Sequence, residues 1–517
     1  MSLTERVSGI LMHISSLPGD YGIGTFGREA RDFIDLLANM DCSYWQILPT
    51  GPIDDCYSPY KSTSAFAGNP FFIDLEMLQQ WGLLTEEELM NSRSKDSPHS
   101  VNYKDLIKNR ETVFALAFHR LTPEFKKDIR KFRRVNHAWL PDFALYTTLT
   151  REFSEPNWTK WKNTSLIHRK PHALYHAMKM YIEEINYHCF LQYAFYRQWF
   201  DLKTYANTKG IKIIGDMPMY ISHESSDVWS HPELFQLDNQ GRPLFVAGVP
   251  PDYFSENGQL WGNPLYRWDV MKTDGYSWWM ERISALLKAY DMVRIDHFRG
   301  FSAYWSVDAS ETTAKKGKWV PGPGMDFFNQ VFEKFQDPGI IAEDLGFQDE
   351  ALTQLLSDTG FPGMRIMEFG FMDATNNTHL PHNYTQNTVA YTGTHDNNTL
   401  LGTFSDYSTE NRTYALNYCN YTDAWENQWK LGGPQSLSCH CFVNSLWQSA
   451  ANLVILPIQD VCGYGEDTKM NQPGTINGNW TFRITKEGLS SIDIQWMKKL
   501  NALYHRAPVK IIKQIAK

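Results

Sequence analysis

Short apolar runs alternate with segments of helical periodicity along most of this 517-residue chain. In residues 276–290, for example, Trp279, Ile283 and Leu286 recur at the spacing of one helix face. Strands that alternate with helices pair in parallel, because each helix crosses back over the sheet before the next strand begins. The candidate strands cover residues 9–15, 44–49, 211–217, 292–297, 340–344, 363–369, 388–394 and 453–459. Eight such units predict a closed (β/α)8 barrel, the TIM barrel.

Three connections are too long to be simple crossovers. Residues 75–200 carry helical stripes, residues 218–275 are rich in proline, glycine and aromatic residues, and residues 397–440 form a third long segment. Long irregular loops in a compact enzyme are usually functional. We therefore predict one catalytic barrel over residues 1–517, with mostly helical and irregular insertions, of which 218–275 is the substrate loop region.

Composition excludes several partners. The net charge is -9 with no long run of lysine and arginine, so nucleic acid is not expected to bind. No apolar stretch reaches the roughly 18 residues that a membrane span needs. The seven cysteines are scattered without a C-x-x-C pair, and the N-terminal residues lack the apolar segment of a signal peptide. These features predict a cytoplasmic protein, with a plastid as the alternative.

Four acidic residues follow apolar runs on four different predicted strands: Asp216, Asp296, Glu343 and Asp396. Active sites of such barrels lie at the C-terminal ends of the strands. One acid in this position is often only a helix N-cap. Four acids at one mouth repel each other unless chemistry or ligands require them, so we favour function. Asp344 points the other way on its strand, and we interpret it as a cap or a supporting group.

Retaining glycoside chemistry uses a carboxylate nucleophile and a carboxylic acid about 5–5.5 Å apart. Arg294 lies two residues before Asp296, on the same face of the strand, and would keep this carboxylate ionised. Asp296 is therefore the candidate nucleophile, Glu343 the general acid/base, and Asp396 the group that binds sugar hydroxyls and favours the oxocarbenium-like transition state. Spacing alone does not separate these roles, and Arg294 is the local clue.

One loop combines aromatic and planar polar residues, the two kinds of side chain that bind glucose rings. Asp252 and Phe254 lie in its first part, and Gln259 and Trp261 in its second. Aromatic rings cover the C–H faces of the sugar, while polar groups bind its hydroxyls. We predict a substrate-binding loop, although Trp261 alone could equally pack into the barrel rim.

The motifs along the chain resemble those of glycoside hydrolase family 77, the amylomaltases or 4-α-glucanotransferases. The resemblance runs nearly end to end and rests on long motifs. They are Ser58–Tyr60, Ser64–Pro70, Gly215–Pro218, the tract from Val246 to Trp268, Arg294–Gly300, Ala342–Gly346, Thr394–Asn397, Asn471–Thr475 and Gly478–Trp480.

This resemblance implies an enzyme that transfers an α-1,4-glucan segment by retaining double displacement through a covalent glycosyl-enzyme intermediate. The donor would be a maltodextrin or amylose and the acceptor the 4-hydroxyl of glucose or another maltodextrin, with no cofactor and no metal. It implies the same roles for Asp296, Glu343 and Asp396, and places Gln259 and Trp261 on a mobile loop over the acceptor side. The residues it implies for sugar contact are Tyr60, Asp216, Arg294, His395 and Asn471.

One stretch departs from the family pattern. A Gly-Tyr-Gly-Asp run usually precedes Ser-Pro-Tyr, whereas residues 54–57 here are Asp-Asp-Cys-Tyr. Asp55 replaces an aromatic residue that some relatives use in a secondary glucan site. The motif therefore gives no support for a second glucan groove.

Three other functions fit parts of the pattern. A metal-dependent hydrolase would need histidine pairs at strand ends, but the first strand offers only His13. A non-catalytic glucan-binding protein would not require all three acids. An α-amylase-like hydrolase would share the mechanism and pass the glycosyl unit to water, and only the products distinguish it from a transferase.

Overall fold

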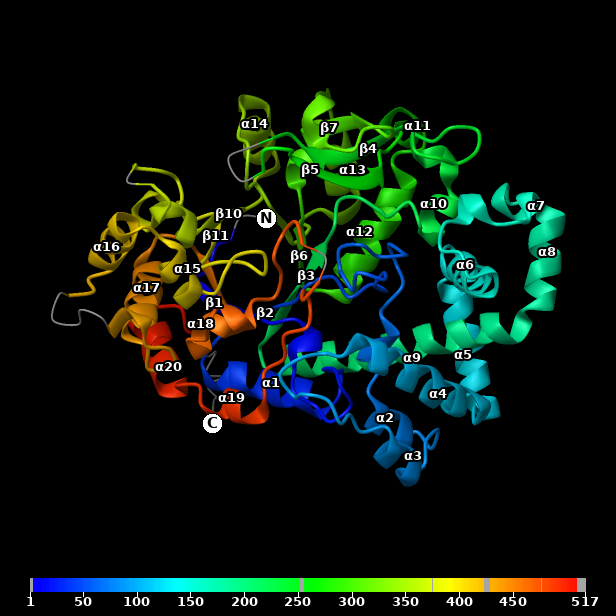
Figure 1. Cartoon of the computed structure of the whole chain (residues 1–517), viewed down its shortest axis with the longest axis horizontal. Coiled ribbons are helices and arrows are strands. Elements are labelled where there is room, and N and C mark those ends of the chain that lie inside the picture. Colours follow the sequence, from blue (N-terminus) through cyan, green and yellow to red (C-terminus); the bar gives the residue numbers. More distant parts are fainter. Residues whose placement is uncertain (1–2, 252–254, 374, 423–427, 476, 509–517) are drawn as a thin grey trace, which may run out of the picture.

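A computed structural model describes residues 3–251, 255–373, 375–422, 428–475 and 477–508 (Figure 1). Eight parallel strands form its central sheet, in the order β10-β11-β12-β1-β2-β3-β6-β9. Their bounds are β1 Val7–Leu11, β2 Tyr44–Gln46, β3 Lys212–Met217, β6 Met292–Ile295, β9 Ile340–Ala342, β10 Gly363–Ile366, β11 Thr388–Tyr391 and β12 Leu453–Pro457. The predicted (β/α)8 class and all eight predicted strands are confirmed, with bounds that shift by a few residues.

The two edge strands of this sheet, β9 and β10, meet through few contacts. The Ala342 N–H donates to the Pro362 carbonyl at 3.0 Å. Beyond it, the buried Asp344 carboxylate accepts the Met364 N–H at 2.6 Å and pairs with Arg365 at 2.9 Å. The Asp344 side chain thus replaces backbone hydrogen bonds where β9 and β10 diverge. The barrel is therefore nearly closed. This is the structural role of Asp344, whose side chain points away from that of Glu343.

We expect the Asp344→Ala variant to be less stable by about 3 kcal/mol, because it leaves Arg365 and the Met364 N–H without their buried acceptor. Arg365 is 28% exposed, so water replaces part of the lost ion pair. Equilibrium urea denaturation measures the change in the free energy of unfolding. Asp344→Asn, which keeps one acceptor oxygen, is the matched control and should lose less. An Asp344→Ala protein as stable as the parent would contradict this role.

Helices surround the sheet and supply the outer layer of the core. In α1 (Arg28–Asn39), Ala30, Phe33, Ile34 and Leu37 are buried at the spacing of one helix face. The strands β1 and β12 are buried at every position, as expected for a parallel sheet covered on both faces. The other helices that cross from one strand to the next are α9 Ile182–Thr208, α12 Ser277–Ala289, α13 Gly324–Phe335, α14 Glu350–Thr359 and α17 Leu437–Gln448. Two more, α18 Ile458–Cys462 and α20 Ile494–Leu503, follow the last strand, β12.

The segment between β2 and β3 is mostly helical and extends to one side of the barrel, on the right in Figure 1. Its long helix α9 leads back to β3 and packs against α4, α5, α6 and α8. The helices before α9 are α2 Leu75–Gln80, α3 Glu86–Asn91, α4 Tyr103–His119, α5 Pro123–Val135, α6 Leu140–Phe153, α7 Thr164–Ile167 and α8 Pro171–Met180.

A second, antiparallel sheet lies above the barrel in Figure 1 and was not predicted from the sequence. Its strands, in the order β5-β4-β7-β8, are β4 Phe245–Val249, β5 Gln259–Pro264, β7 Ala303–Asp308 and β8 Gly317–Pro321. They are short and partly exposed, and both β4 and β5 contain a glycine. Ala247 and Tyr304 join the main core, and the sheet otherwise buries a small cluster around Val246, Val307 and Ala314. Such strands lack the apolar alternation by which sequence reasoning finds a sheet.

The remaining α-helices are α10 Ser226–Ser230, α11 Trp268–Thr273, α15 Leu400–Asp406, α16 Thr409–Tyr418 and α19 Lys486–Ser490. Of the helices in the described ranges, none is both long and apolar enough to cross a membrane.

Candidate active site

Arg294 lies at the centre of a buried charge cluster at the C-terminal ends of β3 and β6. These strands pair so that Asp216 lies beside Arg294. Both oxygens of Asp216 accept from Nη1 of Arg294 at 2.8–2.9 Å, and Nη2 lies 2.9 Å from Asp296 Oδ1. Burial alone would lower the pKa of Arg294, but the two carboxylates outweigh it and raise that pKa well above its usual value. The guanidinium therefore stays charged, with Asp296 partly exposed and Asp216 fully buried.

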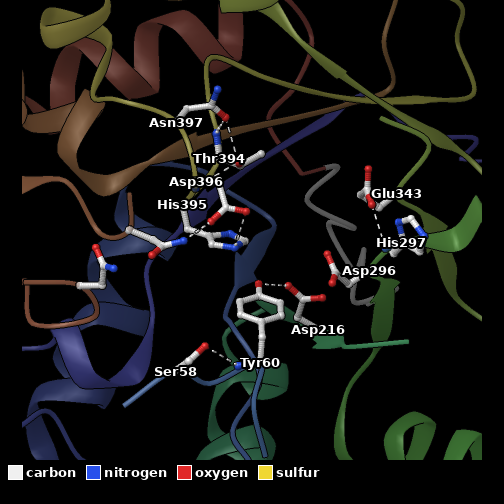
Figure 2. Close-up of polar contacts among 12 residues, drawn as sticks. Ser58, Tyr60, Asp216, Asp296, His297, Glu343, Thr394, His395, Asp396 and Asn397 are labelled. Carbon is white, nitrogen blue, oxygen red and sulfur yellow. Dashed lines mark hydrogen bonds and ion pairs between the residues drawn. The ribbon is translucent and has the colours of Figure 1, made fainter. Parts of the chain in front are cut away.

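Tyr60 connects this cluster to the loop after β11. Its hydroxyl donates to Asp216 Oδ2 at 2.7 Å, and its ring stacks on His395 with centroids 5.0 Å apart. Burial, and then the charge of Asp216, raise the pKa of Tyr60 well above its usual value, so the hydroxyl remains a donor. In Figure 2, Asp296 and Glu343 lie to the right of Tyr60, and Asp396 lies above it, next to His395.

Glu343 directly follows β9 and accepts two backbone hydrogen bonds. The Leu345 N–H donates to Oε1 and the His297 N–H to Oε2, each at 2.8 Å. His297 is in the left-handed region, with φ 52°, which turns the chain after Asp296 and points this N–H at Glu343. Burial raises the pKa of Glu343 to about 7; Asp296 adds to the rise, while Arg294 and the two N–H groups oppose it. The carboxyl can thus exchange a proton near neutral pH.

Asp396 lies on the loop after β11 and is about half exposed. Its Oδ1 accepts from Asn471 Nδ2 at 2.6 Å, and its Oδ2 lies 3.4 Å from Nε2 of His395. The loop turns on Asn397, whose Oδ1 accepts the backbone N–H and the hydroxyl of Thr394 at 2.9 and 2.8 Å. The motif Thr394–Asn397 therefore forms a turn closed by its own hydrogen bonds, and it directs the side chains of His395 and Asp396 into the site (Figure 2).

Trp261 brings the second sheet to the same site. It lies on β5, and its ring meets the His297 ring at 4.8 Å and 90°. Its Nε1–H donates to Gln259 Oε1 at 3.1 Å. The predicted loop residues Asp252 and Phe254 lie outside the described residues.

Every predicted site residue within the described ranges contacts another predicted site residue, either directly or through His297. Sequence reasoning missed His297, which donates to Glu343 and contacts Trp261. It also assigned no role to Trp480, whose ring lies 5.8 Å from that of Tyr60 and 5.9 Å from that of His395. Both residues lie inside motifs that the sequence analysis quoted. The sequence therefore indicated that they lie near the site, but it did not indicate their contacts.

Comparisons with known proteins show the family of this chain. The family model of glycoside hydrolase family 77, described as 4-alpha-glucanotransferase, matches residues 12–489. The chain belongs to this family. It is 42% identical to the 4-alpha-glucanotransferase of Clostridium butyricum, over 96% of this chain and 100% of that protein. It is 41% identical to that of Streptococcus pneumoniae, over 98% of both chains.

A solved structure of a family 77 enzyme has the same fold. The amylomaltase of Streptococcus agalactiae in complex with acarbose superposes with a TM-score of 0.93 and 42% identity, covering 98% of this chain and 100% of that one. The family resemblance, the barrel fold and the enzyme class expected from the motifs are thereby confirmed.

Proposed function

We propose that this enzyme cleaves α-1,4-glucan donors, maltodextrin or amylose, and transfers the glycosyl segment to the 4-hydroxyl of glucose or another maltodextrin. The observation that carries the proposal is the pairing of Glu343, with a pKa of about 7, and Asp296, which is ion-paired to Arg294. One carboxyl can donate a proton while the other stays charged, as retaining double displacement requires. The acarbose complex of the S. agalactiae amylomaltase supports the class of ligand.

In the first step, a carboxylate oxygen of Asp296 attacks the anomeric carbon of the donor. The bond from this carbon to the glycosidic oxygen breaks, and Glu343 gives its proton to that oxygen, which leaves as the 4-hydroxyl of the departing glucan. The product is a glycosyl ester of Asp296. The His297 N–H that donates to Glu343 follows Asp296 in the chain, so one backbone turn sets the position of both groups.

In the second step, Glu343 takes the proton of the acceptor 4-hydroxyl and the acceptor oxygen displaces Asp296. Two inversions retain the α configuration. Water competes for the same intermediate, so a transferase has to position the sugar better than water. We assign this task to Trp261 and Gln259, which lie on β5 beside His297.

The other polar residues of the site would bind the donor sugar. Asp396, between Asn471 and His395, has free lone pairs for sugar hydroxyls and would strengthen these contacts as the ring becomes oxocarbenium-like. A prearranged hydrogen-bonded cluster beside Asp296 consists of Asp216, Tyr60 and Arg294. Prearranged groups stabilise developing charge without reorganising in the transition state.

Incubation with maltotriose tests the proposal. We expect glucose and a ladder of longer maltodextrins, with little net gain in reducing ends, because every cleaved bond is replaced by a new one. Chromatography of the products and a reducing-end assay measure the two quantities. Reducing ends that rise in step with bond cleavage would instead identify a hydrolase.

We further propose that residues 1–517 act as one catalytic unit, with the long segments around the barrel as insertions, and that the enzyme works in the cytoplasm or in a plastid. All seven cysteines lie in the described part of the chain and are free thiols, which is consistent with a reducing compartment.

A further inference from the structure

A single side chain, Asp460, is bonded to both ends of the loop that carries Asp396. The loop leaves β11 at Thr392 and enters α15 at Leu400. The Thr392 hydroxyl donates to Asp460 Oδ2 at 2.5 Å, and the Leu400 N–H donates to Asp460 Oδ1 at 2.8 Å. The two oxygens of one carboxylate thus fix the distance between the two ends of the loop.

Asp460 lies beneath the loop because β12 is the neighbour of β11 in the barrel. It is the third residue of α18, which begins directly after β12, and its side chain is buried. None of its hydrogen bonds goes to Asp296, Glu343 or Asp396. The catalytic assignments above therefore give this buried carboxylate no part in the reaction.

The rest of the loop has little freedom of its own. Its middle is closed by the Thr394–Asn397 turn, and His395 is stacked on Tyr60. The contacts of His395 with Tyr60 and of Asp396 with Asn471 hold the middle of the loop, and Asp460 sets the placement of its two ends relative to the barrel. A shift there would carry Asp396 with it, since Asp396 lies within the turn.

We propose that Asp460 is a positioning residue for the transfer reaction, which holds the Thr392–Leu400 loop so that Asp396 meets the sugar in the transition state. This inference rests on the proposed function. Misplacing a catalytic group by about 1 Å can cost about a hundredfold in rate.

The charge state of Asp460 agrees with this role. Burial raises its pKa to about 6, so at neutral pH it is a carboxylate that accepts from both loop ends. Glu368 is the other buried acid nearby, and burial, followed by the charge of Asp460, raises its pKa well above the usual value. Glu368 contacts the loop through its backbone, whose N–H donates to the Thr392 carbonyl at 3.1 Å, and its carboxyl lies beside Gly393 of the loop. Burial and the charge of Asp460 thus favour the uncharged form of the Glu368 carboxyl.

The test is the Asp460→Asn variant, which keeps the shape of the side chain but has only one acceptor oxygen. We expect kcat on maltotriose to fall about 10- to 100-fold while KM changes less than about threefold. An α-maltotriosyl fluoride donor, which needs no acid assistance, should show a similar loss, because Asp396 acts whatever the leaving group. Glu368→Gln, a neutral substitution at the neighbouring buried acid, is the matched control and should retain the parent kcat.

A double-mutant cycle separates positioning of Asp396 from general loosening of the fold. With the fluoride donor, Asp460→Asn should lower the rate less than about twofold in the Asp396→Asn background, because the group that it positions is already impaired. Equal losses in both backgrounds, or an unchanged kcat in Asp460→Asn, would overturn the inference. If Asp460→Asn does not fold, Thr392→Val, which removes one of the two bonds, takes its place in the same cycle. A parent enzyme without transfer activity would instead count against the proposed function.

Discussion

Asp296→Ala is expected to lower turnover of maltotriose by at least about 10⁴-fold while leaving the fold intact, because no other residue can form the glycosyl ester. The fold should survive because Arg294 keeps its two hydrogen bonds to Asp216 after the substitution. Initial rates measure the loss of turnover, and circular dichroism together with the thermal midpoint measures folding.

A 5-fluoro glycosyl fluoride donor tests the same assignment directly. The second fluorine slows both steps, and the fluoride leaving group speeds the first, so the ester on the nucleophile accumulates. Peptide mass spectrometry should find the label on Asp296, and none on the Asp296→Asn protein, which is the matched control. A label on Glu343 or Asp396 would show that this residue, and not Asp296, is the nucleophile.

Glu343→Gln is expected to lower the rate on maltotriose by about 10³-fold or more, since both proton transfers are lost. The effect should depend on the leaving group. A maltosyl fluoride needs no proton to depart, so Glu343→Gln should still release fluoride in the first step. Comparable losses on the two donors would contradict the acid role.

The pH dependence of the parent enzyme follows from the same residue. Glu343 has to be protonated in the first step, and its pKa is about 7. The protonated fraction falls as the pH rises through that value, so the rate should decline about tenfold for each further pH unit. We expect a bell-shaped profile whose alkaline limb belongs to Glu343. With the fluoride donor, under conditions where the first step limits the rate, that limb should disappear, and its persistence would assign it to another group.

The order of the strands and the acids at their ends could be predicted from the sequence. Short apolar runs such as Met292–Ile295 are buried on both faces, and the residue that follows such a run is held at the mouth of the barrel whatever the rest of the fold does. Asp296 and Glu343 each follow a strand directly, as predicted, while their roles stay predictions. Arg294 followed from the same rule, because residues two apart on a strand share a face.

Contacts between distant segments were decided only by the tertiary structure. The short strands of the second sheet carry no pattern strong enough to be read, yet they bring Trp261 against His297. His297 has a positive φ, and its N–H donates to Glu343, which follows the neighbouring strand β9. Asp460 is separated from Thr392 by 68 positions in the chain, and only the pairing of β11 with β12 places its carboxylate under the loop of Asp396. The sequence by itself therefore determined which groups are candidates for the chemistry. The tertiary structure decided how these groups are held. A hydrogen bond between residues on two different strands depends on how the strands pack, and it leaves no periodic pattern in the sequence of either strand.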